Sequence, residues 1–476
     1  MRRILSTTFL ALFLCTCGSA QITGKWYAIL DAMGTKLPLA LDLQDEGGEL
    51  AGTLKSPSQS PTAFPFSSVS FDGQRFQFAL ADMGADFSGV LNGKEIQGVF
   101  NQAQVDFPIK FTRYRPDGFP ISDGPVTLVK RSQEPTDFPY QREAITFPGG
   151  ADGVTISGEL TMPTKGKPRA AIILVSGSGP QDRNSFLGSQ INHSPFLVLS
   201  DYLTRKGFAV LRYDDRGVGE STGDYATATT YDFAADAGAA VGYLKGRKDF
   251  KRVDVGMAGH SEGGLITPIV AAETGELDFA LLLAAPGVSI DSLMLSQRRA
   301  VGQSMGMPSS MIELDDKRWR AAYAFIKESP ALDTDQYIEA LYGVFERQMM
   351  HLPEALQRSI KDPKAFNAQF VEPMAQPWMR NFITMDPTPY LEKMTIPTLA
   401  INGLKDLQVD AMQNLNGISI AMARNENKDA TIAPLPDLNH LFQPADTGAP
   451  NEYGTIETTF DPTALEVIGA WLEERY

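Results

Sequence analysis

The chain has 476 residues, with 57 acidic residues against 42 basic ones and a formal net charge of −15 at pH 7. This length leaves room for roughly two or three domains, and the composition is that of an ordinary globular protein. The negative charge argues against nucleic acid or an anionic membrane surface as a partner. Nothing in the sequence decides the oligomeric state.

Residues 1–20 have the pattern of an export signal. A basic pair precedes an apolar run and small residues suited to cleavage before Gln21: Arg2-Arg3, Ile4–Cys17 and Gly18-Ser19-Ala20. The apolar run is too short to span a bilayer, and no second run is long enough to do so. We therefore expect a periplasmic or secreted protein. A lipid anchor on Cys17 is the weaker alternative, because the residues around it match a lipoprotein cleavage box poorly.

Both cysteines of the chain, Cys15 and Cys17, lie in this segment. After cleavage the chain would contain neither a disulfide nor a thiol nucleophile. That absence fits a protein made for an oxidising compartment.

Residues 21–113 differ in pattern from the rest of the chain. Short segments of alternating polar and apolar residues recur between turns: 39–43, 49–54, 76–80, 85–91 and 95–100. A period of two with frequent turns predicts a small antiparallel β-domain, and Trp26 is expected in its core. This domain carries no catalytic pattern, so an alternative hypothesis makes it a binding module that docks the protein on a surface or partner. The proline-rich residues 114–141 are interpreted as a linker.

Residues 142–476 alternate between strand and helix patterns. The run Ala170–Val175 is continuously apolar, as expected for a strand that is buried on both faces. Strand–helix alternation predicts an α/β domain with a mostly parallel sheet covered on both sides by helices. In such sheets the chemistry lies at the carboxyl ends of the strands.

The segment 288–390 interrupts this alternation. It has helical periodicity, no strand pattern and many methionines, and it predicts an inserted helical subdomain. Methionine adapts its shape to varied apolar ligands, but most of these residues are expected to form the core of the insertion.

The sequence Gly-His-Ser-Glu-Gly at 259–263 follows a short apolar run and precedes a helical segment. This pattern predicts a strand, a sharp turn and a helix, with Ser261 exposed at the apex of the turn as a nucleophile. Gly259 and Gly263 would remove side chains that collide across so tight a turn.

A serine nucleophile needs a base and an acid that orients the base, and the chain has four histidines. His440 lies just past the last predicted strand and before the closing helix, where a sheet enzyme of this order carries its base. His260 is the neighbour of Ser261 and is expected to point elsewhere. Asp406, in the loop after the strand 397–401, is the predicted acid. Asp410 is the alternative, although it is expected to cap the next helix.

An oxyanion hole needs two N–H donors. One is predicted from Glu262, directly after the nucleophile, and the other from Ser178, in the loop after the strand at 170–175. Gly177 and Gly179 would let the backbone of this loop approach a ligand closely. A phosphate-binding loop is a weak rival, because no Gly-Lys-Ser/Thr comes after it.

Several stretches resemble the α/β-hydrolase superfamily, and more narrowly the secreted bacterial carboxylesterases related to its serine-aminopeptidase-like branch. They are Ser176–Arg183, Arg212–Ser221, Gly259–Gly264, Gly403–Val409 and Asn439–Gln443. The resemblance implies a Ser261–Asp406–His440 triad, no metal, no cofactor, and a helical cap at 288–390. The loop at 176–183 lacks the His-Gly-Gly form of lipases, so its oxyanion donor stays open.

The function expected from these residues is hydrolysis of a small carboxylic ester through an acyl-enzyme. A peptidase or amidase acting on short peptides is the alternative. The side chain of Glu262 is expected to separate the two. It would either pair with Arg216, which leaves no anionic site for substrate, or receive the free amine of a peptide. The ion pair with Arg216 is the favoured expectation.

Overall fold

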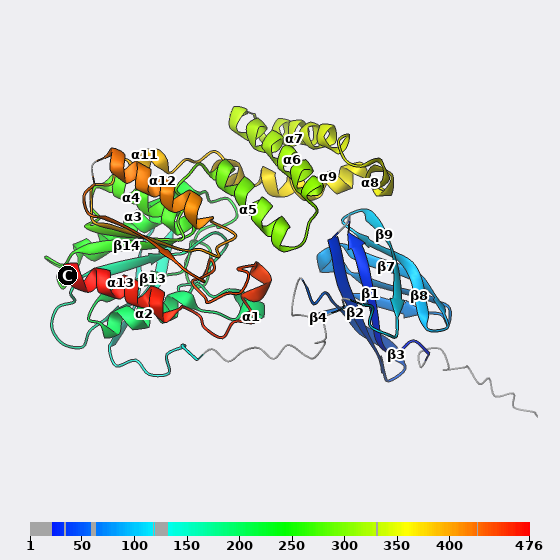
Figure 1. Ribbon diagram of the computed structural model, residues 1–476. Helices are drawn as coiled ribbons and strands as arrows, with labels where there is room; N and C mark the ends of the chain where they lie inside the picture. Colours follow the sequence, from blue (N-terminus) through cyan, green and yellow to red (C-terminus); the bar gives the residue numbers. More distant parts are fainter. Residues whose placement is uncertain are drawn as a thin grey trace, which may run out of the picture. The chain divides into compact units, whose positions relative to one another are not determined.

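The computed structural model describes residues 21–32, 35–58, 63–117, 119, 132–329, 332–425 and 427–476. The expected export signal, both cysteines and most of the expected linker lie outside these residues. The described chain divides into two compact units. The first holds the residues up to 119 together with Arg358–Asp362, and the second holds the rest of the chain from 132 onward (Figure 1).

The first unit is built on a nine-stranded antiparallel sheet in the order β4-β3-β2-β1-β9-β8-β7-β6-β5. Its strands are β1 (Gly24–Ala32), β2 (Thr35–Glu46), β3 (Glu49–Lys55), β4 (Ala63–Pro65), β5 (Ser68–Phe71), β6 (Arg75–Leu80), β7 (Ala85–Asn92), β8 (Glu95–Gln102) and β9 (Val105–Thr112). The sheet curls on itself (Figure 1). Alternate residues of each strand therefore meet inside, as the period of two predicts.

Trp26 lies at the centre of this core and is fully buried. Its indole N–H donates to the carbonyl oxygen of Ile22 at 2.7 Å. The guanidinium of Arg113 lies 3.7 Å from the centre of the ring. The tryptophan is thus a packing residue of the β-domain, and its polar atom already has a partner.

The second unit contains an eight-stranded sheet in the order β10-β11-β13-β12-β14-β15-β16-β17. The strands are β10 (Gln141–Pro148), β11 (Thr155–Met162), β12 (Ala171–Val175), β13 (Ala209–Tyr213), β14 (Val255–His260), β15 (Phe279–Leu283), β16 (Thr398–Gly403) and β17 (Ala430–Leu435). β10 pairs antiparallel with β11, and β11 pairs antiparallel with β13. From β13 to β17, neighbouring strands pair parallel. Because every residue of β12, β13 and β15 is buried, these strands are continuously apolar or nearly so.

Helices cover both faces of this sheet (Figure 1). One face packs on α2 (Pro195–Arg205) and α13 (Pro462–Arg475), and the other on α3 (Thr230–Gly246), α4 (Glu262–Thr274) and α12 (Ala411–Arg424). A short helix, α1 (Gly188–Ile191), precedes α2. The layers confirm the doubly covered α/β sheet expected from the sequence, preceded by an antiparallel β-domain.

Between β15 and β16 the described chain forms a series of helices. They are α5 (Ile290–Ser304), α6 (Ser309–Glu328), α7 (Thr334–Met349), α8 (Glu354–Ser359), α9 (Pro363–Ala375), α10 (Pro377–Phe382) and α11 (Thr388–Leu391). Aromatic rings hold the middle of this insertion together. Trp319 of α6 lies edge-on to Phe345 of α7, and Phe345 stacks on Phe370 of α9 at 5.5 Å between ring centres.

Candidate active site

Ser261 lies at the apex of a sharp turn between β14 and α4. Its backbone has φ 55° and ψ −117°, a conformation that side chains rarely adopt. Close packing explains the glycines on either side. A Cβ on Gly259 would lie 1.9 Å from the carbonyl oxygen of Gly263, and a Cβ on Gly263 would lie 2.2 Å from that of Val175. Gly259 is therefore required by the turn itself, as the sequence predicts. Gly263 is required by the close approach of β12 and not by a collision across the turn.

His440 and Asp406 form a buried hydrogen-bonded pair. Nδ1 of His440 lies 2.7 Å from Oδ2 of Asp406, and both side chains are almost fully enclosed. The other carboxylate oxygen of Asp406 accepts the backbone N–H groups of Gln408 and Val409 at 2.8 and 2.9 Å. The alternative acid, Asp410, instead caps α12 by accepting from the N–H of Gln413 at 2.7 Å. The structure thus places Asp406, and not Asp410, behind the imidazole.

A cavity of about 330 Å³ opens over the nucleophile turn. Ser261 and His440 both line it, and so do Gly177, Ser178 and Glu262. The rest of its wall is mainly apolar or uncharged: Gln181, Ser185, Leu187, Ile191, His260, Pro286, Leu293, Met294, Gln297, Trp378, Phe382, Gln408, Val409, Leu441 and Tyr453. Among these described lining residues Glu262 carries the one carboxylate, and none is a lysine or arginine. The expected nucleophile and base therefore share one small, largely apolar chamber.

The loop after β12 forms the wall opposite Ser261. A Cβ on Gly177 would lie 3.1 Å from the Cβ of Ser261, so this loop passes close to the nucleophile. Gly179 has φ 95°, a left-handed value that favours glycine. The side-chain amide of Gln181 donates to the carbonyl oxygens of Gly177 and Ser178 at 3.1 and 3.2 Å. These bonds fix the orientation of the Gly177 and Ser178 carbonyl groups.

Asp215, at the end of β13, anchors the same loop from behind. Its carboxylate accepts the Ser176 hydroxyl at 2.9 Å and the backbone N–H of Gln181 at 3.0 Å. Burial raises the pKa of Asp215 to about 7, against the opposing effect of these hydrogen bonds. The carboxyl group therefore lies close to its titration point at neutral pH.

Arg216 does not pair with Glu262, so the expected ion pair is wrong. Its Nε lies 2.7 Å from Oδ2 of Asp236, and its Nη1 lies 3.1 Å from Oδ1 of Asp232. The two aspartates stand one turn apart on α3 and offer carboxylates on the same face of the helix. Arg216 therefore ties the end of β13 to α3, away from the cavity.

Glu262 instead receives neutral donors. Its Oε1 accepts the Thr230 hydroxyl at 2.6 Å and the indole N–H of Trp378 at 2.8 Å, and the Ser178 hydroxyl also bonds the carboxylate. Burial raises the pKa of Glu262, and these three hydrogen bonds act in the opposite direction. Because Glu262 begins α4, its backbone N–H has no partner within the helix.

His260 contributes to the site, contrary to the expectation that it points elsewhere. Its Nε2 donates to the carbonyl oxygen of His440 at 2.9 Å, and the two rings lie 4.8 Å apart. Enclosure in the protein, and then the neighbouring His440, lowers the pKa of His260 to about 3, so the ring is neutral at neutral pH. The alternation of side chains along β14 predicts this placement of His260. The side chain of His260 shares a sheet face with Ala258, which packs in the same cluster as Phe442.

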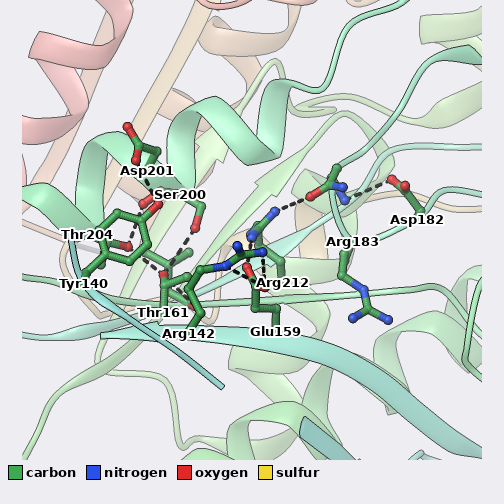
Figure 2. Close-up of polar contacts among 12 residues, drawn as sticks. Tyr140, Arg142, Glu159, Thr161, Asp182, Arg183, Ser200, Asp201, Thr204 and Arg212 are labelled. Atoms are coloured by element: carbon green, nitrogen blue, oxygen red, sulfur yellow. Dashed lines mark hydrogen bonds and ion pairs between the residues drawn. The ribbon is translucent and has the colours of Figure 1, made fainter. Parts of the chain in front are cut away.

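A polar network connects β11 and β13 to the loop that follows β12 (Figure 2). Arg212 of β13 is buried, and it contacts the Glu159 carboxylate on one side and the Asn184 side chain on the other. The backbone N–H of Asn184 in turn donates to Asp182 at 2.9 Å. Neighbouring Arg183 clasps Asp214 through its backbone N–H at 2.7 Å and its guanidinium at 2.6 Å. Ion pairs thus hold together the stretches 176–183 and 212–221, which are two of those that resemble the α/β-hydrolase superfamily.

The inserted helices supply part of the cavity wall. Leu293, Met294 and Gln297 come from α5, and Trp378 and Phe382 from α10. Of the ten methionines between residues 294 and 394, Met374, Met385 and Met394 are buried, Met305 and Met350 are exposed, and the other five are partly exposed. The expectation that most of these methionines form a core is therefore not confirmed.

In the described part of the chain, no group of three or more His, Cys, Asp or Glu side chains could hold a metal ion. No helix among the described residues combines the length and the hydropathy needed to cross a membrane.

Comparison with known proteins gives the site its context. Residues 192–442 match the family described as serine aminopeptidase, S33. Esterase EstD of Thermotoga maritima is 26% identical over 318 residues, which are 67% of this chain and 65% of the relative, so the match covers slightly less than two thirds of that protein.

The solved structures that the chain matches include two from other organisms. Esterase Pf2001 of Pyrococcus furiosus is 16% identical and covers 70% of this chain and 93% of its own, with a TM-score of 0.40. A proline iminopeptidase of Mycobacterium smegmatis is 14% identical and covers 70% and 98%, with a TM-score of 0.42. The family match spans more than half of the 476 residues and includes Ser261, Asp406 and His440. The chain therefore belongs to the serine aminopeptidase S33 family of α/β-hydrolases.

Proposed function

We propose that the protein is an exported serine hydrolase that cleaves small, uncharged carboxylic esters through an acyl-enzyme. The observation that carries this proposal is the placement of Ser261, on its strained turn, in one chamber with the His440–Asp406 pair. The relative in Thermotoga maritima is named an esterase, which agrees with it.

In the proposed mechanism, His440 takes the proton of Ser261 as the hydroxyl oxygen attacks the ester carbonyl. Nδ1–H of His440 donates to Asp406, which holds the ring and stabilises the imidazolium. The backbone N–H groups of Glu262 and Ser178 receive the developing oxyanion. His440 then gives its proton to the leaving alcohol, and water releases the acid by the reverse path. His260 steadies the backbone of His440 throughout, because it donates to that carbonyl oxygen.

Substrate charge decides between ester and peptide. An aminopeptidase needs an anionic group to receive the free amine of its substrate. Glu262 is the one carboxylate among the described residues that line the chamber, and it is 3% exposed and already accepts hydrogen bonds from Thr230, Trp378 and Ser178. An ammonium group would have to displace these donors inside the protein. This arrangement favours a neutral ester, for a different reason than the expected pair with Arg216.

Export is proposed from residues 1–20 alone, which combine a basic start, an apolar run and small residues before Gln21. Expression of the full chain in a bacterial host, followed by mass analysis of the N-terminal peptide, tests it. A mature chain beginning at Gln21 is expected. A lipid-modified Cys17 or an uncleaved Met1 would contradict it.

Activity profiling tests the proposed reaction. The purified protein is assayed with p-nitrophenyl esters from acetate to octanoate beside aminoacyl p-nitroanilides, with Ser261→Ala as the control. We expect turnover of short and medium esters, none by the control, and little hydrolysis of the anilides. Faster cleavage of the aminoacyl anilides than of the esters would make the protein an aminopeptidase.

A further inference from the structure

The carboxylate of Glu262 joins three parts of the chain that meet at the chamber. Thr230 is the first residue of α3, Trp378 lies on the inserted helix α10, and Ser178 belongs to the loop opposite the nucleophile. No cation bonds this carboxylate among the described residues. It is held entirely by neutral donors, although it is almost completely buried.

A carboxylate suits this position because it accepts hydrogen bonds and donates none when ionised. Every group that hydrogen-bonds the Glu262 carboxylate here is a donor: two hydroxyls and an indole N–H. A glutamine of the same shape would bring an NH₂ group toward donors. It would have to give up at least one of these contacts, or force a hydroxyl to turn around.

The contact with Trp378 fixes one wall of the chamber. The indole N–H lies 2.8 Å from Oε1 of Glu262, which sets the rotation of the ring. Trp378 stacks on Phe382, one turn further along α10, with 4.7 Å between ring centres. Both rings line the cavity. The depth of this wall therefore depends on the hydrogen bond between Trp378 and Glu262, the residue next to Ser261.

The contact with Ser178 reaches the other side of the chamber. The Ser178 hydroxyl bonds the Glu262 carboxylate, and its backbone N–H is the proposed second oxyanion donor. One side chain thus holds both an apolar wall and the loop that receives the oxyanion. The same residue supplies the first oxyanion donor from its own backbone.

We propose that Glu262 is a positioning residue that couples acyl-chain selectivity to the oxyanion hole, and that Trp378 is the specificity-determining residue it positions. The acyl chain of the ester lies against the stacked pair of Trp378 and Phe382. This inference rests on the proposed function and deepens it, because it names the part of the cavity wall that determines acyl-chain selectivity.

A double-mutant cycle tests the coupling. Trp378→Phe, Glu262→Gln and the double variant are assayed for the ratio of kcat/KM on p-nitrophenyl octanoate to that on p-nitrophenyl acetate. Loss of the indole contact should change this ratio by about tenfold, since a methylene-sized change in an apolar pocket is worth that much. Glu262→Gln should change the ratio in the same direction and also lower kcat on both esters. In the double variant the ratio should stay near that of Glu262→Gln alone.

Tyr231→Phe is the matched control. The Tyr231 hydroxyl links α3 to Tyr390 of α11 at 3.1 Å, so its loss removes another contact between α3 and the segment before β16, but outside the chamber. Its ratio should equal that of the wild type. Additive effects in the double variant, an unchanged ratio in Trp378→Phe, or an equal shift in the control would each overturn the inference.

Labelling rates separate this inference from the proposed function. Short-chain and long-chain alkyl fluorophosphonates react with an activated serine without any ester turnover, and mass spectrometry gives their rates at Ser261. If the wild type is labelled at Ser261 but hydrolyses no ester, the proposed function fails. The ratio of the two labelling rates then still tests whether the wall formed by Trp378 and Phe382 determines chain-length selectivity. Should Glu262→Gln not fold, Trp378→Phe and Tyr231→Phe carry this comparison by themselves.

Discussion

Two aspartates in one loop have separate roles. Asp406 accepts from His440, whereas Asp410 caps α12. Replacement of Asp406 by Asn should lower kcat by about 10⁴-fold with the fold intact, because the imidazole loses the partner that sets its tautomer. Asp410→Asn should keep near-normal turnover, because asparagine is an equally good helix cap. Steady-state kinetics on both variants, with circular dichroism, make the comparison. Equal losses of activity would show that the acid is misassigned.

Asp215 should make stability depend on pH. Its pKa is about 7 in the folded protein and near the ordinary 3.8 when unfolded, so between these values the folded state holds a proton that the unfolded state has lost. The free energy of unfolding should therefore fall as the pH rises from about 4 to about 7.

The comparison variant is Asp215→Asn, whose amide can still accept from the Gln181 N–H and donate to the Ser176 oxygen. Melting temperatures of both proteins are measured from pH 5 to pH 8. The wild type should lose stability relative to the variant across this range. A constant difference in Tm would show that Asp215 does not take up a proton on folding.

At the scale of elements, the edge of the sheet depends on a buried ion pair. Arg212 of β13 has a side chain only 2% exposed, and it pairs with Glu159 of β11, which Arg142 also contacts from the surface. Burial lowers the pKa of Arg212, and the charge of Glu159 opposes that change. Glu159→Gln would leave a buried cation without its counter-ion, which should destabilise the protein by about 3 kcal/mol.

Arg142→Gln is the matched control for this pair. The Arg142 side chain is 44% exposed, so its loss should cost less than about 1 kcal/mol. Urea denaturation followed by fluorescence measures both variants. A similar loss of stability in the two would contradict the special position of Arg212.

Structural features can be predicted from the sequence where contacts between residues close together in the chain determine them. Gly259 indicates the turn at Ser261, because the collision that it avoids is with Gly263, four residues further along. The helix cap at Asp410 is equally local. The collision that Gly263 avoids is with Val175 of β12 and is not local. The partner of Glu262 was not predictable in this way. Trp378 lies 116 residues further along the chain, on a helix whose placement depends on the packing of the whole insertion.

The same contrast holds for Arg216 and His260. The expected nearness of the strand ends before Arg216 and Glu262 favours a pair between these two residues. In the structure, however, α3 presents Asp232 and Asp236 to the guanidinium of Arg216. The sequence predicts that His260, the neighbour of Ser261, points elsewhere, but strand alternation turns its side chain toward the loop of His440. The sequence specifies which residues are present, and the docking of helices on the sheet selects their partners.

At the scale of the whole molecule, the second unit holds every described residue that lines the chamber. The β-domain has its own core around Trp26, independent of the site. We therefore propose that the α/β-hydrolase unit carries the chemistry, with Ser261 as its nucleophile.

Stoichiometric labelling with a fluorophosphonate tests the role of Ser261 most directly. The full-length protein is titrated with the reagent while hydrolysis of p-nitrophenyl butyrate is followed, and the modified peptide is then identified by mass spectrometry. If Ser261 is the nucleophile, activity should fall in proportion to labelling, one equivalent should abolish it, and the label should be on Ser261. Turnover that survives complete labelling, or a label on any other residue, would contradict this assignment.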